Sequence, residues 1–244
     1  MNINNKKVLI TGASSGIGQA AAIALAQKGA YVYASYNSNK TGAQQTLNEV
    51  QKHSNGEILQ ANLENKDEVQ AMFEKIETID TLVNNAGAAN SSDIDDYDMW
   101  EHQWKNIFMS AVYCTNEFLK KNESNLRDKK IVNISSMYGN FDQCDPDFIQ
   151  YSAAKAAMSN FTVAVAKKYG AQGLSANAVA PGWTETPPWK SVSEADKQSL
   201  TATTLLGGML RPESIANGVV FLLETDGITG QIITIDNGLF PPTE

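Results

Sequence analysis

The sequence predicts an α/β fold in which a doubly wound parallel sheet of about seven strands lies between two layers of helices. Short apolar runs, typical of buried strands, alternate with helical segments along the whole chain. A glycine-rich turn joins the first strand to the first helix, as in a βαβ unit. No repeat, linker or low-complexity tract interrupts this pattern, so residues 1–244 are expected to form one domain.

The expected strands are short and apolar, and several end at glycine, proline or asparagine. They cover residues 8–10, 31–35, 58–61, 80–86, 131–135, 174–180 and 232–236. The helices between them run to residue 28, over 40–53, 66–76, from the acidic segment 93–98 to 121, from about 151 to 169, and over 212–224. Gly29 suits the end of the first helix, and Pro212 suits the first turn of the last one.

The stretch from Pro181 to Thr204 is the least regular part of the sequence. It combines prolines and tryptophans with many serines and threonines. A long irregular segment in a compact domain is usually a lid or a binding loop. Residues 183–204 are therefore expected to form a substrate loop that orders when a ligand binds.

The composition argues against several classes of function. Hydrophobic residues make up 42% and charged residues 19%, as in ordinary soluble α/β proteins. A net charge of −8 without a basic stripe argues against nucleic acid or an anionic membrane surface as partner. No apolar run approaches a membrane span, and the polar start does not resemble a signal peptide, so a cytoplasmic protein is expected. Two cysteines without CxxC spacing and two separated histidines predict neither a disulfide framework nor a metal site.

The glycine-rich turn predicts a phosphate-binding site. Its glycines, Gly12, Gly16 and Gly18, stand between a buried strand and an alanine-rich helix. Gly12 permits a tight turn, and the other two let the backbone approach a pyrophosphate at the positive end of the helix dipole. A turn made only for packing is the alternative, but the strand–helix–strand context favours nucleotide binding.

Tyr151 and Lys155 form the most informative pair in the sequence. Residues four apart on a helix share one face, so the phenol and the ammonium lie side by side. A free tyrosine titrates near pH 10, about three units too high for proton exchange at neutral pH. A cation about 5 Å away is predicted to supply most of the required lowering of the pKa. An exposed amphipathic pair with no chemical role is the alternative.

Several motifs, in order along the chain, resemble those of the short-chain dehydrogenase/reductase family, in its short single-domain branch of 3-oxoacyl reductase-like carbonyl reductases. They are Thr11-Gly12-x-x-x-Gly16-x-Gly18, Asn84-Asn85-Ala86-Gly87, Asn106, Asn133-Ile134-Ser135-Ser136, Tyr151-x-x-x-Lys155, Pro181-Gly182-x-x-x-Thr186, and Thr229-Gly230-Gln231 with Asp236-Asn237-Gly238. The resemblance implies a Rossmann-like fold and hydride transfer between NAD(P)(H) and a carbonyl or a secondary alcohol.

The resemblance also implies roles for four side chains. Tyr151 would exchange the proton of the substrate oxygen, and Ser136 would stabilise the charge that develops there. Lys155 would lower the pKa of Tyr151 and hold the nicotinamide ribose. Asn106 would position a water that links Lys155 to solvent. Ser136 and Tyr151 are fifteen positions apart, about two more than is usual in the family, which we interpret as a bulge in the loop over the substrate.

The implied cofactor site is large. Besides Tyr151 and Lys155 it contains Gly12, Ser14, Ser15, Gly16, Ile17, Gly18, Asn37, Asn62, Leu63, Asn85, Ala86, Gly87, Pro181, Gly182, Thr184 and Thr186. The substrate is expected to contact Ser136, Tyr138, Tyr151, Trp183 and Trp189. Together with Met137, Phe141 and Phe148 these side chains suggest an apolar or aromatic substrate, with simple loop packing as the alternative.

The end of the second strand bears on the choice of cofactor. An acidic residue there would bind the ribose 2′-hydroxyl of NAD. This sequence has Tyr36 at that position, followed by Asn37, and has no carboxylate to repel a 2′-phosphate. Lys40 and small polar donors could bind the phosphate, although Ser15 stands where many NADP-using relatives carry a basic residue. The sequence therefore favours NADP(H) over NAD(H).

Two alternatives to a general carbonyl reductase remain. A 3-oxoacyl thioester reductase is one, although the net charge argues against an acidic carrier protein as partner. A nucleotide-sensing or assembly protein without turnover is the other, and the intact Ser136, Tyr151 and Lys155 argue against it. A homodimer or homotetramer is expected through the two long helices, which carry the apolar residues Phe108, Ala111, Val112, Phe118, Phe161 and Val165.

Overall fold

A parallel seven-stranded sheet forms the centre of the computed structural model, which describes residues 1–140 and 143–239. Its strands are β1 (Lys7–Ile10), β2 (Tyr31–Tyr36), β3 (Gly56–Gln60), β4 (Thr81–Asn84), β5 (Lys130–Ile134), β6 (Ser175–Pro181) and β7 (Ile232–Ile235). The strand order is β3-β2-β1-β4-β5-β6-β7, and every neighbouring pair is parallel. The predicted fold class is confirmed.

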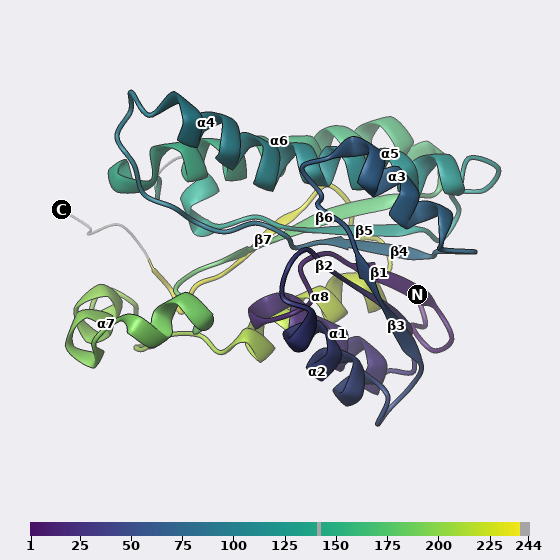
Figure 1. The fold of residues 1–244 in the computed structure, drawn as a ribbon, viewed down its shortest axis with the longest axis horizontal. Coiled ribbons are helices and arrows are strands. Elements are labelled where there is room, and N and C mark those ends of the chain that lie inside the picture. Colours follow the sequence, from purple (N-terminus) through teal and green to yellow (C-terminus); the bar gives the residue numbers. More distant parts are fainter. Residues whose placement is uncertain (141–142, 240–244) are drawn as a thin grey trace.

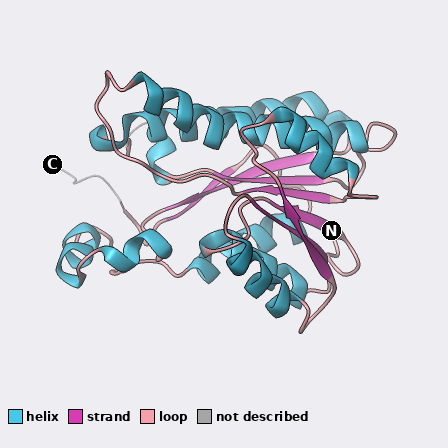
Figure 2. Cartoon of the chain, in the orientation of Figure 1, coloured by secondary structure: helices cyan, strands magenta, loops and turns pink. Residues whose placement is uncertain are grey.

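Helices cover both faces of the sheet, as Figures 1 and 2 show. One layer consists of α1 (Gly16–Gln27), α2 (Lys40–Val50) and α8 (Pro212–Glu224), and the other contains α3 (Lys66–Glu74), α5 (Ser110–Lys121) and α6 (Ile149–Tyr169). Successive side chains of a strand point to opposite faces. Val8 and Ile10 accordingly join the core beneath α1 and α8, while Leu9 joins the core on the other side with Phe118.

The strand order creates a crevice at the carboxyl edge of the sheet. β1 and β4 are neighbours, but the chain leaves β1 toward one edge of the sheet and leaves β4 toward the other. The connections that follow these two strands therefore diverge, and ligands of doubly wound sheets bind at this point.

The predicted long helix that ends at residue 121 is not continuous. It consists of α4 (Tyr97–Gln103), a π-helical turn (Trp104–Met109) and α5. A π-helical turn widens the ring closed by each hydrogen bond and often marks a functional site. The Ser110 hydroxyl donates to the Asn106 carbonyl at 2.7 Å, which satisfies an acceptor inside the irregular turn.

The expected irregular segment 183–204 contains two helices. A 3₁₀ turn covers Pro187–Ser191, and α7 covers Glu194–Thr201. The Ser193 side chain caps α7 by accepting from the backbone N–H of Asp196 at 3.1 Å. Figure 1 shows α7 apart from both helical layers.

The apolar residues that we expected at a subunit interface are only partly available for one. Ala111, Phe118 and Val165 are buried in the chain's own core. Phe108 packs between Trp104 and Phe161, with ring centroids 4.7 and 5.8 Å away, and Trp104 is 40% exposed. Among the described helices, none is long and apolar enough to cross a membrane.

Candidate functional site

A cavity of about 930 Å³ occupies the carboxyl edge of the sheet. It runs from the end of β2, past the glycine-rich turn, to the start of α6 and the segment after β6. All the predicted catalytic and substrate residues line this cavity. So do the predicted cofactor residues, with the exception of Gly18.

The glycine-rich turn requires backbone conformations that other residues adopt with strain. Gly12 has a φ of +65° and Gly16 a φ of +55°. A Cβ atom on Gly12 would lie 3.0 Å from the Cα of Ala86, in the segment that follows β4. The Thr11 hydroxyl fixes this close approach by accepting from the backbone N–H groups of Asn85 and Ala86 at 2.8 and 3.0 Å.

Gly18 supports the cavity from behind. A Cβ atom there would overlap the Gly12 carbonyl oxygen and the Asn85 side-chain amide. That amide donates to the carbonyl oxygens of Thr11 and Gly12 at 2.8 and 3.2 Å. Gly18 therefore permits the packing that places the turn, although it does not line the cavity itself.

The start of α1 is suited to a pyrophosphate. Ser15 is its N-cap residue, and its side chain makes no capping hydrogen bond, whereas Asn39 caps α2 and Asn65 caps α3. The first turn, with Gly16 and Ile17, lines the cavity. A helix N-terminus with available N–H groups favours an anion. These features and the glycine cradle fit the pyrophosphate of a dinucleotide.

Uncharged polar groups surround the cavity at the end of β2. Tyr36 is 5% exposed, and Asn37 is exposed. Ser38 and Asn39 also line this end, whereas Lys40 does not. Lys40, one of the groups considered for binding a 2′-phosphate, is thus not supported by its position, whereas the small polar donors are present.

The two serines after β5 have different surroundings. The Ser135 hydroxyl bonds to Ser159 at 2.7 Å and to the Lys155 carbonyl at 3.0 Å, so it fastens β5 to α6. The Ser136 hydroxyl accepts from the Tyr138 backbone N–H at 3.2 Å and contacts the Tyr151 hydroxyl. Of the two serines, Ser136 is thus the one in contact with the Tyr151 hydroxyl.

Burial controls the ionisation of the tyrosine–lysine pair. It raises the pKa of Tyr151, and the hydrogen bond with Ser136 opposes this rise. The same burial lowers the pKa of Lys155 to about 7. The Lys155 ammonium donates to the Ile134 carbonyl at 2.7 Å and lies 5.6 Å from the centroid of the Tyr151 ring. The predicted lowering of the Tyr151 pKa by Lys155 is thus wrong, because desolvation disfavours the charged forms of both groups.

Gly139 supports the site without lining the cavity, and it was not predicted from the sequence. A Cβ atom on it would lie 2.8 Å from the carbonyl carbon of Lys155. The turn Met137–Gly139 therefore packs directly on the backbone of α6 and carries Ser136 and Tyr138 over the catalytic pair. A glycine soon after a buried strand was the available signal.

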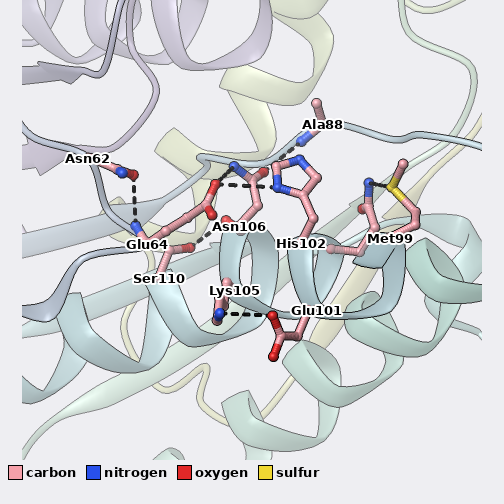
Figure 3. A network of polar contacts seen from close by, with 10 residues as sticks. Asn62, Glu64, Ala88, Met99, Glu101, His102, Lys105, Asn106 and Ser110 are labelled. Atoms are coloured by element: carbon pink, nitrogen blue, oxygen red, sulfur yellow. Dashed lines mark hydrogen bonds and ion pairs between the residues drawn. The ribbon is translucent and has the colours of Figure 1, made fainter. Parts of the chain in front are cut away.

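Glu64 is a second residue that the sequence analysis missed. Its Oε1 atom accepts from the Asn106 side-chain amide at 3.1 Å and lies 3.6 Å from His102 Nδ1, as Figure 3 shows. The Asn106 side-chain oxygen in turn accepts from the backbone N–H of Ala88 at 3.3 Å. Glu64, Asn106 and Ala88 all line the cavity, so this network joins three segments of its wall.

Aromatic rings form the wall on the substrate side. Tyr138 lies at its centre, with ring centroids 5.6 Å from Trp183, 5.9 Å from Phe148 and 6.3 Å from Tyr151. Trp183 packs edge-on against Trp189 at 5.5 Å. Phe141, which we also expected in this wall, lies outside the described residues.

Within the described chain, no group of histidine, cysteine, aspartate and glutamate side chains could hold a metal ion.

Comparison with known proteins places this geometry among oxidoreductases. The family profile described as Enoyl-(Acyl carrier protein) reductase matches residues 12–240. The 3-oxoacyl-[acyl-carrier-protein] reductase FabG of Thermotoga maritima is 32% identical over 253 residues, which cover 98% of this chain and 99% of that protein.

Two solved structures carry NADP in a similar fold. One is a candidate 2-deoxy-D-gluconate 3-dehydrogenase of Agrobacterium tumefaciens, 28% identical, with a TM-score of 0.87 over 97% of this chain and 96% of that one. The other is the angucycline C-6 ketoreductase LanV, 25% identical, with a TM-score of 0.89 over 98% of this chain and 96% of that one.

Proposed function

This chain belongs to the short-chain dehydrogenase/reductase family and is an NAD(P)-dependent oxidoreductase, and we propose that it interconverts a carbonyl compound and a secondary alcohol with NADP(H) as cofactor. The observation that carries the proposal is the placement of Ser136, Tyr151 and Lys155 along one wall of the cavity that begins at the glycine-rich turn. When bound, the cofactor supplies or accepts the hydride.

The side chains divide the remaining work. Tyr151 holds the proton that the substrate oxygen gains in the reducing direction. Ser136, which contacts the Tyr151 hydroxyl, donates a hydrogen bond to the same oxygen and stabilises its developing charge. Lys155 carries a buried ammonium whose pKa, about 7, lets it gain or lose a proton at neutral pH. The glycine-rich turn and the start of α1 hold the pyrophosphate.

A preference for NADP(H) follows because none of the described residues that line the cavity at the end of β2 is a carboxylate. Ser15, Asn37, Ser38 and Asn39 line that end of the cavity, and each can donate a hydrogen bond to a 2′-phosphate. The NADP bound to two solved relatives supports the same choice.

Replacing the tyrosine hydroxyl tests the proposal. We expect Tyr151→Phe to lower kcat for a ketone panel by about 10²–10⁴-fold, followed by NADPH absorbance at 340 nm. The dissociation constant for NADPH should stay within a factor of about two. Tyr113→Phe, on α5 and away from the cavity, is the matched control and should leave kcat unchanged. Unchanged turnover in Tyr151→Phe would reject the assignment of the proton donor.

A 3-oxoacyl thioester reductase is the second candidate, since similar proteins are named 3-oxoacyl-[acyl-carrier-protein] reductase FabG. Parallel assays with a 3-oxoacyl thioester and simple ketones decide between the two.

We also propose a homodimer or homotetramer. The exposed ring of Trp104 and the partly buried rings of Phe108 and Phe161 favour an interface on that face. A sedimentation mass of 26.5 kDa at micromolar concentration would contradict it.

A further inference from the structure

The charges around the cavity are mostly negative. Three carboxylate residues line it, Glu64, Asp145 and Asp147. Among the lining residues of the described chain, Lys155 is the single cationic one, and its ammonium is buried and donates to the Ile134 carbonyl. A negatively charged ligand portion beyond the catalytic pair would therefore meet carboxylates and, among the described residues that line the cavity, no accessible cation. Two cationic residues, Lys190 and Lys197, line a separate pocket that shares Trp189 with the cavity.

Two of these carboxylates belong to the substrate side. The Asp145 side chain accepts from the backbone N–H of Asp147 at 2.9 Å and caps the 3₁₀ turn Pro146–Phe148. This turn also carries Phe148, whose ring packs against Tyr138. The capping bond thus holds the negative charges next to the aromatic wall.

The pKa of Tyr138 shows that the charges of Asp145 and Asp147 reach the aromatic wall. Burial raises the pKa of Tyr138, and a side-chain hydrogen bond to Asp145 and the negative charges of Asp145 and Asp147 raise it further. Both carboxylates therefore lie near the Tyr138 hydroxyl, and both also line the cavity. The aromatic faces around it are electron-rich as well, and such faces attract cations and not anions.

On these grounds we propose, resting on the function assigned above, that the site selects bulky apolar or aromatic carbonyl compounds that carry no negative charge and accepts a positive one. Asp145 and Asp147 act as specificity residues that repel anionic substrates. Acyl groups on a phosphopantetheine arm carry a phosphate and belong to the disfavoured class.

A panel of three matched ketones tests charge selection: an aryl methyl ketone with a para-trimethylammonium, a para-methyl ester or a para-carboxylate group. We expect kcat/KM of the ammonium compound to equal or exceed that of the ester, and kcat/KM of the carboxylate to be about tenfold lower. The difference should shrink as the salt concentration rises, because these charges are near solvent.

The double variant Asp145→Asn/Asp147→Asn removes both charges and leaves an oxygen at position 145 that can still cap the turn. It should bring kcat/KM of the carboxylate compound to within about twofold of that of the ester. Asp98→Asn, an exposed residue that does not line the cavity, is the matched control and should leave the selectivity as it is.

Equal kcat/KM values for the three ketones, or unchanged selectivity in the double variant, would overturn the inference. If the wild-type protein reduces none of the ketones, the proposed reaction is wrong instead. Quenching of tryptophan fluorescence by the same three compounds then still tests charge selection, because Trp183 and Trp189 lie in the wall. Equal affinities in that measurement would overturn the inference as well.

Discussion

The two ends of the cavity are built in different ways. At the cofactor end, backbone meets backbone: Gly12 lies against Ala86, and Gly18 against the Gly12 carbonyl. At the substrate end, the wall consists of aromatic side chains on short turns. Backbone contacts at such distances admit only glycine, whereas a wall of rings admits many combinations of similar volume. The cofactor end can therefore be predicted from the spacing of its glycines. The sequence also indicates Tyr138, Trp183 and Trp189 for the substrate wall, but the way their rings pack is seen only in the structure.

The largest effect is expected where backbone contacts leave no space. Gly18→Ala should weaken NADPH binding by at least about 100-fold, because the new Cβ displaces either the glycine-rich turn or the Asn85 amide. Gly170→Ala, at a helical glycine with nothing within 4 Å, is the matched control and should bind NADPH normally. Titration of NADPH fluorescence measures both. Normal NADPH binding by Gly18→Ala would show that the cofactor end is less rigid than its backbone contacts indicate.

Lys155 lies between the two ends, and its burial predicts a pH dependence of stability. Its pKa is lowered from 10.5 to about 7 on folding, so between these pH values the unfolded chain binds more protons than the folded protein. The free energy of unfolding of the wild type should therefore rise, relative to Lys155→Met, as the pH increases from 7 toward 10.5. The rise should amount to at most about 4–5 kcal/mol.

Urea denaturation at pH 7 and pH 9.5 measures this difference. Lys105→Met, which removes an exposed lysine, is the control. Its free energy of unfolding should change between the two pH values by the same amount as that of the wild type. If the difference in free energy of unfolding between the wild type and Lys155→Met is the same at both pH values, the interpretation of Lys155 as a buried lysine with a lowered pKa is contradicted.

The hydrogen bond between Glu64 and Asn106 lies at the border between the two ends of the cavity. Substitution of Glu64 tests whether this bond positions Asn106 for the proposed reaction. Glu64→Ala should lower kcat about tenfold with little change in KM, because Asn106 loses its charged hydrogen-bond partner. Glu101→Ala is the control, because it removes an exposed carboxylate that pairs with Lys105, one position before Asn106. This variant should not change kcat. In the Asn106→Ala background the Glu64 substitution should add almost nothing. Additive losses would mean that Glu64 does not act through Asn106.

The smallest effect concerns cofactor choice. Tyr36→Asp should shift the preference toward NAD by about five- to tenfold, since a carboxylate accepts from the ribose 2′-hydroxyl and repels a 2′-phosphate. Because Tyr36 is buried, Asn37→Asp, at an exposed neighbour, provides a second test with less risk to folding. Asn48→Asp, on the outer side of α2, is the control. Unchanged ratios of affinity for NADP and NAD in both variants would remove the basis of the assignment.

The same contrast explains what the sequence could predict. The strands and most helices follow from periodicity, and the glycine-rich turn and the Tyr151 helix follow from residue types at fixed spacing. The helix α7 was missed although Ser193 and Asp196 have the spacing of an N-terminal cap. The role of Glu64 could not be predicted, because Glu64 lies in a loop 42 positions before Asn106 and only the fold brings the two side chains together. The ionisation of Tyr151 was misjudged because burial is a tertiary property.

The π-helical turn has a consequence for protein engineering. A π-helical turn holds one residue more than the α-helical turn it replaces, so removal of one residue within Trp104–Met109 would let α4 continue into α5 as a regular helix. The segments on either side would keep their orientation, so Phe118 would stay in the core. The main change would fall on the turn itself, where Asn106 contacts Glu64. The extra residue in this segment therefore affects the placement of Asn106 more than the packing of the helix.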